Sequence, residues 1–416
     1  MGNDQAGCSL DAMTNVCHMH QCLKEIKGRA SSSTSPSDIW IGALKENTTF
    51  RSTPVKCVCM KISINESSVP KHLMADYTRL QCMGLKYELS VYNQIVTPIL
   101  DALICPNFLR SYLVSTDCDY AALAMTVESH VANPHQIRNL NRNLCYMMHG
   151  LGNRPAIDDS TISEGVPPLG QVGTKYMVLS TEYTNVVTYF DWLEEVEGMD
   201  EKRRNSAECV AARQCVLLQI AIALYVMEKA KLLHYDLHAN NIFIQKLDRV
   251  ETWTYRIHGR VITVRTRFKA MIFDFDRAVC PTLGPNELSR YIYGDYCGFQ
   301  ENRDIVTLYA YLQLEPILLK LSLMDSFFKV AIPPGTDLLA DWYRQPGTCL
   351  QSSIWNGITL LAHRLGSGDR SVDLGTVYTI HDHMFSRDGV LLPKLAPFVR
   401  KHAERARRQA HPFSKP

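Results

Sequence analysis

The residues best suited to chemistry in this sequence lie in two short segments, LLHYDLHANNIFI at 232–244 and IFDFDRA at 272–278. In the first segment Asn241 follows Asp236 by five residues, and in the second Asp274 comes directly after an apolar run. Phosphoryl transfer needs such a set, because one carboxylate must meet the attacking hydroxyl while an amide oxygen and a second carboxylate hold Mg²⁺ against the phosphates. We expect Asp236 on a loop between a helix and a strand, and Asp274 at the end of the next strand, where the three side chains can converge.

A rigid support for Asp236 is predicted by the residues that precede it. The segment 211–230 is apolar on nearly all helical faces, which is typical of a buried helix. This helix runs directly into the segment that carries Asp236, so it can hold the geometry of a reactive group. A second buried helix is predicted to begin near Asp304, which is followed by apolar residues at helical spacing.

The two segments resemble motifs of the protein-kinase superfamily. The first matches the catalytic loop H-R-D-L-x-x-x-N at four positions: His234, Asp236, Leu237 and Asn241. The second resembles the metal loop D-F-G, with Asp276 in place of the glycine. The HYDLH, DFD and FDRA sequences are most similar to the divergent serine/threonine kinases of large DNA viruses. The resemblance covers about residues 24–315 and is sharp only at these two motifs.

This resemblance implies an α+β, bilobal protein-kinase-like fold, with a small β-rich lobe and a larger, mainly helical lobe. We expect an N-terminal extension at 1–23 and a small lobe at 24–180, interrupted by an insertion at about 113–172. The large lobe is expected at 181–416, with divergent C-terminal helices and a basic tail. The tail suits a solvated helix, a nuclear-import signal or a nucleic-acid contact.

The resemblance also implies a lysine that holds the α- and β-phosphates of ATP. Lys61 ends a predicted strand at 55–62 and fits best, with Lys56 as its rival. Glu88 lies beside an apolar helical stripe, where the family uses a glutamate to fix the lysine by an ion pair. The alternatives are an exposed lysine at a strand end and a solvated helix glutamate.

Further nucleotide contacts are implied at five positions. Gly28 lies where the first glycine of a phosphate-covering loop would be, but no GxGxxG is present, so the loop is either a phosphate cover or a linker. Cys59 would lie under the adenine ring. The segment 174–183 resembles the strand that leads to the hinge, where Thr181 would guard the back pocket. The carbonyl of Glu182 and the amide of Thr184 would bind the adenine edge.

The catalytic loop departs from the family at two positions. Tyr235 replaces an arginine that often receives an activating phosphate, which argues against that mode of activation. His238 replaces a lysine that contacts the γ-phosphate, and the same D-x-H pattern occurs in small-molecule kinases such as aminoglycoside phosphotransferases. A purely structural histidine is the alternative. The family also implies that Asp304 ties down the catalytic loop.

Together these residues imply an ATP- and Mg²⁺-dependent protein kinase acting on Ser and Thr hydroxyls. Asp236 would orient the hydroxyl and accept its proton, and Asn241 and Asp274 would hold the metal. Lys61, fixed by Glu88, would hold the phosphates, with His238 beside them. The alternatives are a small-molecule kinase, favoured by His238 and the missing APE motif, and a pseudokinase scaffold, favoured by Asp276 and the missing glycine loop.

Composition adds few constraints on partners. The 416 residues are 46% hydrophobic and carry a net charge of +2, which indicates no general attraction to nucleic acid or membrane. No signal peptide or membrane-spanning run is predicted, so the fourteen cysteines are expected to be reduced thiols in the cytoplasm or nucleus. If the chain is viral, the host cell and the virion are the expected locations.

A hairpin at 251–269 carries basic side chains that suit a solvated face, an acidic protein partner or nucleic acid. A zinc site at Cys17–Cys22 is disfavoured by its spacing.

Overall fold

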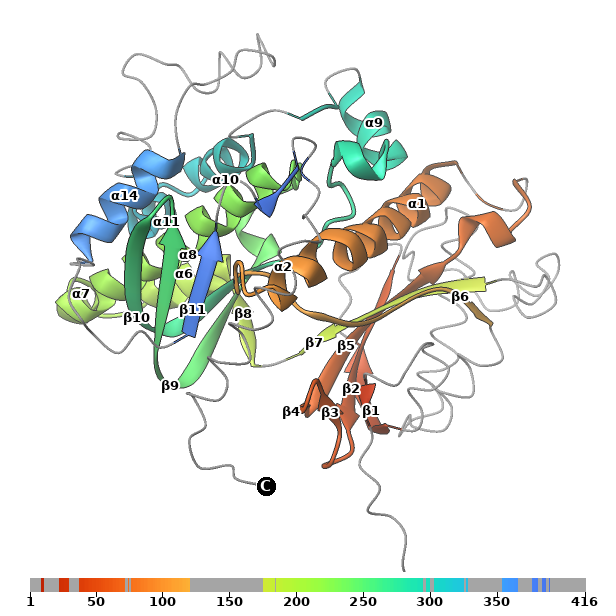
Figure 1. Ribbon diagram of the computed structural model, residues 1–416, viewed down its shortest axis with the longest axis horizontal. Helices are drawn as coiled ribbons and strands as arrows, with labels where there is room; N and C mark the ends of the chain where they lie inside the picture. Colours follow the sequence, from red (N-terminus) through yellow and green to blue (C-terminus); the bar gives the residue numbers. More distant parts are fainter. Residues whose placement is uncertain are drawn as a thin grey trace, which may run out of the picture. The chain divides into compact units, whose positions relative to one another are not determined.

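The computed structural model describes part of the chain (Figure 1): residues 9–10, 22–29, 37–71, 74, 76–119, 175–183, 185–294, 297–299, 303–324, 327, 354–365, 376–380, 384–386 and 389. The chain divides into two compact units. Unit 1 comprises Met1–Asn93, Arg110–Thr184 and Asn286–Ile292, and unit 2 comprises Gln94–Leu109, Asn185–Pro285 and Tyr293–Pro416. This division differs from the continuous one expected from the sequence, because 94–109 joins unit 2 and 286–292 joins unit 1.

Helices and largely antiparallel sheets make up the described residues, so the predicted α+β class is confirmed. Unit 1 contains a five-stranded antiparallel sheet in the order β1-β2-β5-β7-β6. Its strands are β1 (Leu23–Arg29), β2 (Asp38–Leu44), β5 (Cys57–Ile64), β6 (Ser111–Asp119) and β7 (Lys175–Glu182). A short hairpin, β3 (Thr49–Phe50) and β4 (Thr53–Pro54), stands apart from this sheet.

Strand β5 follows the predicted alternation but ends later than expected. Val58, Met60 and Ile62 are buried, whereas Cys59 and Lys61 share the half-buried face. The strand continues through Ser63 and Ile64, so Lys61 lies inside it and not at its end.

The predicted insertion at 113–172 begins too early. Strand β6 pairs with β7 from Ser111 to Asp119, so residues 113–119 form an edge of the sheet. The remaining part of the predicted insertion lies outside the described residues.

Helix α1 (Asp76–Val91) contacts β5, β6 and β7 and presents a buried stripe to them. Leu85 and Leu89 are each 1% exposed, which confirms the predicted apolar face. The helix continues as a π-helical turn (Tyr92–Val96) and then as α2 (Thr97–Asp101).

Unit 2 is built around α8 (Ala207–Lys229), which packs on β10 and α14. The long hairpin β9 (Ile242–Ile257) and β10 (Arg260–Ile272) turns at His258 and Gly259, which both have positive φ. Strand β8 (Val186–Thr188) and strand β11 (Thr376–Ile380) pair with β9, and β11 does so in parallel. The other helices are α6 (Tyr189–Glu197), α7 (Glu201–Arg204), α10 (Arg303–Gln313), α11 (Pro316–Ser322) and α14 (Ile354–Arg364).

Helix α8 is, within the described residues, the one helix with the length and apolar composition to cross a membrane. Of its most apolar 18-residue window, 72% is buried inside the structure, and a core helix meets the same criteria. The predicted all-round apolar helix is therefore present and forms the core of unit 2.

A buried polar network joins α8 to the strand that leads into the DFD loop. The amide of Asn107 donates to the side-chain oxygen of Gln219 and to the carbonyl of Ala270, both at 2.9 Å. The hydroxyl of Tyr255 donates to Asn107 Oδ1 at 3.0 Å. Buried polar groups that are mutually satisfied fix a single packing, so the end of β10 has little freedom to shift.

Two surface predictions fall partly within the described residues. The basic side chains Arg256, Arg260, Arg265 and Arg267 are exposed on the hairpin and Lys269 is half-buried, and an acidic partner there stays a prediction. Nine described cysteines are free thiols. Cys22, however, is buried and disulfide-bonded, so the expectation of reduced thiols is wrong at this position. The other members of the Cys17–Cys22 cluster and the basic tail lie outside the described residues.

Candidate functional site

The catalytic-loop and DFD segments lie side by side in unit 2. Leu233 and Val279 exchange two backbone hydrogen bonds, at 2.9 and 2.8 Å. At the other end the backbone N–H of Phe273 donates to the carbonyl of Asn241 at 3.2 Å. Between them, Nε2 of His234 lies 2.8 Å from the carbonyl oxygen of Phe273, an acceptor, so this nitrogen carries the proton. The expected approach of the two segments is therefore confirmed.

Asp304 holds the backbone of the first loop from α10. Its carboxylate accepts hydrogen bonds from the N–H groups of His234, at 2.7 Å, and Tyr235, at 3.0 Å. Burial raises the pKa of Asp304, while His234 and the two N–H groups favour the charged form and oppose the rise. The structural role predicted for Asp304 is present in the hydrogen bonds.

Tyr235 adopts a left-handed backbone conformation, with φ of 66°, which is uncommon for a bulky residue. Its hydroxyl donates to the carbonyl of Gly298 at 2.6 Å and accepts from the N–H of the same residue at 2.8 Å. The guanidinium of Arg303 lies 3.8 Å from the centre of the Tyr235 ring. The phenol thus ties the segment after the DFD loop to the loop that carries Asp236.

Asn241 and Asp274 were predicted to hold Mg²⁺, and their side chains supply an amide oxygen and a carboxylate. The Nδ2 of Asn241 donates to the carbonyl of Asp236 at 3.0 Å, which fixes the amide so that its oxygen remains as the ligand atom. Asp274 follows the end of β10 with φ of 69°, a strained value that re-aims the chain as the strand ends. Carboxylate and amide oxygens suit a hard cation. No cluster of three or more His, Cys, Asp or Glu side chains with metal-binding geometry occurs in the described residues, so phosphate oxygens and water would have to complete the shell.

The Asp236 carboxylate faces two basic side chains. Nη1 of Arg277 lies 2.8 Å from Oδ1, and Nε2 of His238 lies 3.9 Å from Oδ2. Burial lowers the pKa of His238; Asp236 and Asp274 oppose this effect, so both carboxylates lie within electrostatic range of the ring. The ring also packs against Tyr311, with centres 5.2 Å apart. Arg277 was not predicted from the sequence, where its only signal is a cation directly after the DFD motif.

Unit 1 contains the predicted ion pair. Nζ of Lys61 lies 2.7 Å from Oε2 of Glu88. The Glu88 side chain is only 2% exposed, so it is not a solvated helix charge. Lys56 is exposed and precedes β5, which removes it as the rival. The pairing is confirmed, whereas a role of Lys61 in phosphate binding stays a prediction.

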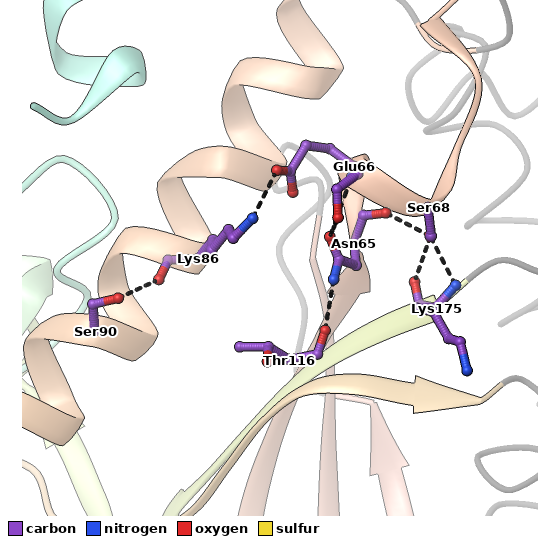
Figure 2. A network of polar contacts seen from close by, with 8 residues as sticks. Asn65, Glu66, Ser68, Lys86, Ser90, Thr116 and Lys175 are labelled. Atoms are coloured by element: carbon purple, nitrogen blue, oxygen red, sulfur yellow. Dashed lines mark hydrogen bonds and ion pairs between the residues drawn. The ribbon is translucent and has the colours of Figure 1, made fainter.

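A polar network fixes the connection between β5 and α1, and therefore the two carriers of this ion pair. Figure 2 labels its members: Asn65, Glu66, Ser68, Lys86, Ser90, Thr116 and Lys175. Asn65 Nδ2 donates to the carbonyl of Thr116 at 2.7 Å, and the N–H of Lys175 donates to Ser68 Oγ at 2.8 Å. These bonds hold the start of the connection to β6 and β7. Lys86 pairs with Glu66 at 3.1 Å and ties the same connection to α1 (Figure 2).

The other residues that were predicted to contact the nucleotide agree with the structure to different degrees. Cys59 lies on the Lys61 face of β5, opposite Thr181 of β7, and burial raises the pKa of its thiol to about 11. Glu182 ends β7, and its N–H donates to the carbonyl of Arg110 at 2.8 Å. Gly28 lies within β1 opposite Ile41, not in a turn. Thr184 lies outside the described residues.

Comparisons with known proteins give little support. No protein-family model matches the chain, and no curated protein matches it. Among solved structures, the chain is similar to one titled "WaaP in complex with acyl carrier protein", at 10% identity and a TM-score of 0.32, with 84% of this chain and 92% of that chain covered.

Proposed function

We propose that this protein is a phosphotransferase of the protein-kinase-like fold, which moves the γ-phosphoryl group of ATP to Ser or Thr hydroxyls of proteins. The observation that carries the proposal is the pair of joined loops in unit 2. Backbone hydrogen bonds join the loops that carry Asp236, Asn241 and Asp274, and Asp304 holds the first loop by two hydrogen bonds to its N–H groups. The Lys61–Glu88 pair in unit 1 is the second, independent support.

Each residue has a defined task in the proposed reaction. Asp236 orients the acceptor hydroxyl and takes its proton as the new O–P bond forms and the bond to the β-phosphate oxygen breaks. Asn241 and Asp274 would hold Mg²⁺, which supplies charge neutralisation of the phosphates when bound. Lys61, fixed by Glu88, binds the α- and β-phosphates. Alignment and charge stabilisation supply most of the acceleration.

A small-molecule acceptor is the second candidate, because His238 lies beside Asp236 where protein kinases have a lysine. A neutral imidazole supplies less charge at the γ-phosphate than an ammonium group does. A pseudokinase scaffold is the third candidate, favoured by Asp276 and by the missing glycine-rich loop. The intact set of Lys61, Asp236, Asn241 and Asp274 disfavours it.

The deciding experiment is transfer from radiolabelled ATP to a panel of proteins and small alcohols, including aminoglycosides. The matched variants are Asp236→Asn and Asp248→Asn, since Asp248 is an exposed aspartate of β9. We expect the wild type and Asp248→Asn to transfer phosphate, and Asp236→Asn to keep its melting temperature but lose transfer. Transfer by Asp236→Asn at the wild-type rate would show that Asp236 has another role. Labelling of small alcohols alone would select the second candidate.

Nucleotide binding can be tested separately by thermal shift. A ligand that binds only the folded protein raises the melting temperature, so MgATP is expected to stabilise the wild type. The expected control is Lys61→Met, which lacks the cation and should show a smaller shift. No shift for the wild type at millimolar MgATP would favour the scaffold.

A further inference from the structure

Arg277 forms an ion pair with the carboxylate of Asp236. Its Nη1 lies 2.8 Å from Oδ1, with side chains that are 34% and 25% exposed. An ion pair at this distance is attractive, and partial burial limits its screening by water. Arginine is always protonated in proteins, so the cation is permanent. One oxygen of Asp236 is therefore held, and the carboxylate cannot rotate without breaking this ion pair.

The other oxygen of Asp236 is less constrained. Oδ2 lies 3.9 Å from Nε2 of His238, which is beyond hydrogen-bond distance. The two oxygens can therefore have different roles. Oδ1 pairs with the guanidinium of Arg277, and Oδ2 can accept a hydrogen bond from an acceptor hydroxyl. A carboxylate that is held at one oxygen presents the other in a defined direction, which is what alignment of an attacking group needs.

The position of Arg277 in the chain links it to the metal-binding loop. It lies three residues after Asp274, in the segment that is joined to the catalytic loop at Leu233 and Val279. Its side chain also lies within electrostatic range of Tyr293. The Tyr293 hydroxyl donates to the carbonyl of Tyr235 at 3.1 Å. The guanidinium therefore bridges the DFD loop that carries it and the Asp236 carboxylate with which it pairs.

We infer that Arg277 is a positioning residue: it holds the Asp236 carboxylate by Oδ1, so that Oδ2 faces the acceptor hydroxyl, and it does so from the loop that carries Asp274. This inference rests on the proposed function. Removal of the guanidinium leaves Asp236 in place but free to rotate. The loss therefore falls on kcat for transfer, and the KM for ATP changes little.

The test uses the full chain with Arg277→Ala and Arg277→Lys. Because a misaligned group commonly costs about 10- to 100-fold in rate, we expect Arg277→Ala to lose kcat by about that factor, with the KM for ATP within about twofold of the wild type. Millimolar guanidinium ion should restore part of the activity of Arg277→Ala, whereas a general structural defect would not respond. Arg290→Ala is the matched control, since Arg290 forms an exposed ion pair with Glu287 at 3.4 Å.

Arg277→Lys keeps the test decisive if Arg277→Ala does not fold. Its shorter ammonium is expected to transfer phosphate at a kcat reduced by about three- to tenfold. The inference is overturned if folded Arg277→Ala has wild-type kcat, if its loss is not rescued by guanidinium, or if Arg277→Lys has wild-type kcat. Asp236→Asn distinguishes a failure of this inference from a failure of the proposed function. Loss of transfer in this variant, with no loss in the Arg277 variants, leaves the proposed function standing and removes the inference alone. A wild type that transfers no phosphate removes both.

Discussion

Replacement of Asp304 by alanine tests how the catalytic loop is held. The carboxylate is 4% exposed and accepts two hydrogen bonds, from the N–H groups of His234 and Tyr235. Alanine leaves both N–H groups buried without this acceptor, and each such loss costs about 1–3 kcal/mol. The gross loss is therefore about 2–6 kcal/mol. Removal of a buried carboxylate, whose burial raises its pKa, returns part of this energy, and we expect a net loss near 3 kcal/mol.

Two measurements check this value. Urea denaturation gives the change in the free energy of unfolding, and hydrogen exchange reports the amides of His234 and Tyr235 directly. A local loss of about 3 kcal/mol corresponds to an increase of roughly 150-fold in the exchange of these amides by local opening. Asp248→Ala is the control, because the Asp248 side chain is exposed on β9 and should change neither quantity.

A loss below about 0.5 kcal/mol in Asp304→Ala, with unchanged exchange of both amides, would show that the carboxylate does not hold the loop, because surface substitutions lie within that range. Loss of stability without faster exchange at His234 and Tyr235 would show the same. In that case the carboxylate would stabilise the fold by contacts other than the two bonds to the loop.

Two further predictions concern the hydroxyl of Tyr255 and the thiol of Cys59. Tyr255→Phe removes the donor to Asn107 Oδ1 inside unit 2, and we expect a loss of about 1–2 kcal/mol in urea denaturation; an unchanged midpoint would mean that this network does not stabilise the fold. Because desolvation raises the pKa of Cys59 to about 11, only about 0.1% of its thiol is ionised at pH 8, so iodoacetamide should label it more slowly than Cys209, which is half-buried as Cys59 is, and faster as the pH rises toward that value. Mass spectrometry gives both rates, and equal rates at pH 8 would contradict the assignment. Slower labelling of Cys59 with MgATP present would support its predicted place beside the nucleotide.

The sequence predicted the parts of the site that depend on residue type at fixed spacing. Asp236, Asn241 and Asp274 lie on adjoining loops because an apolar helix and an apolar strand lead into them, and both patterns are visible in the sequence. The Lys61–Glu88 pair was expected from the resemblance to protein kinases, while strand alternation and a helical stripe predicted only the element that carries each residue. These are local periodicities, which the fold preserves.

The features that the sequence did not reveal depend on tertiary contacts. Arg277 contacts Asp236 only because the two loops adjoin, and no periodicity links the two positions. Strand β6 was mistaken for the start of an insertion, because a register shift between Ser115 and Cys118 breaks its alternation of buried and exposed residues. The end of strand β5 was predicted too early because Ile62, Ser63 and Ile64 are all buried. The alternation of buried and exposed residues, which marks a strand in the sequence, therefore stops before the strand does.

The contact between Tyr235 and Gly298 has a consequence for how these two segments respond to salt. It consists of two hydrogen bonds between uncharged groups. Salt screens charges and not such bonds, so we expect the two segments to stay joined at ionic strengths that weaken the exposed ion pairs of the surface.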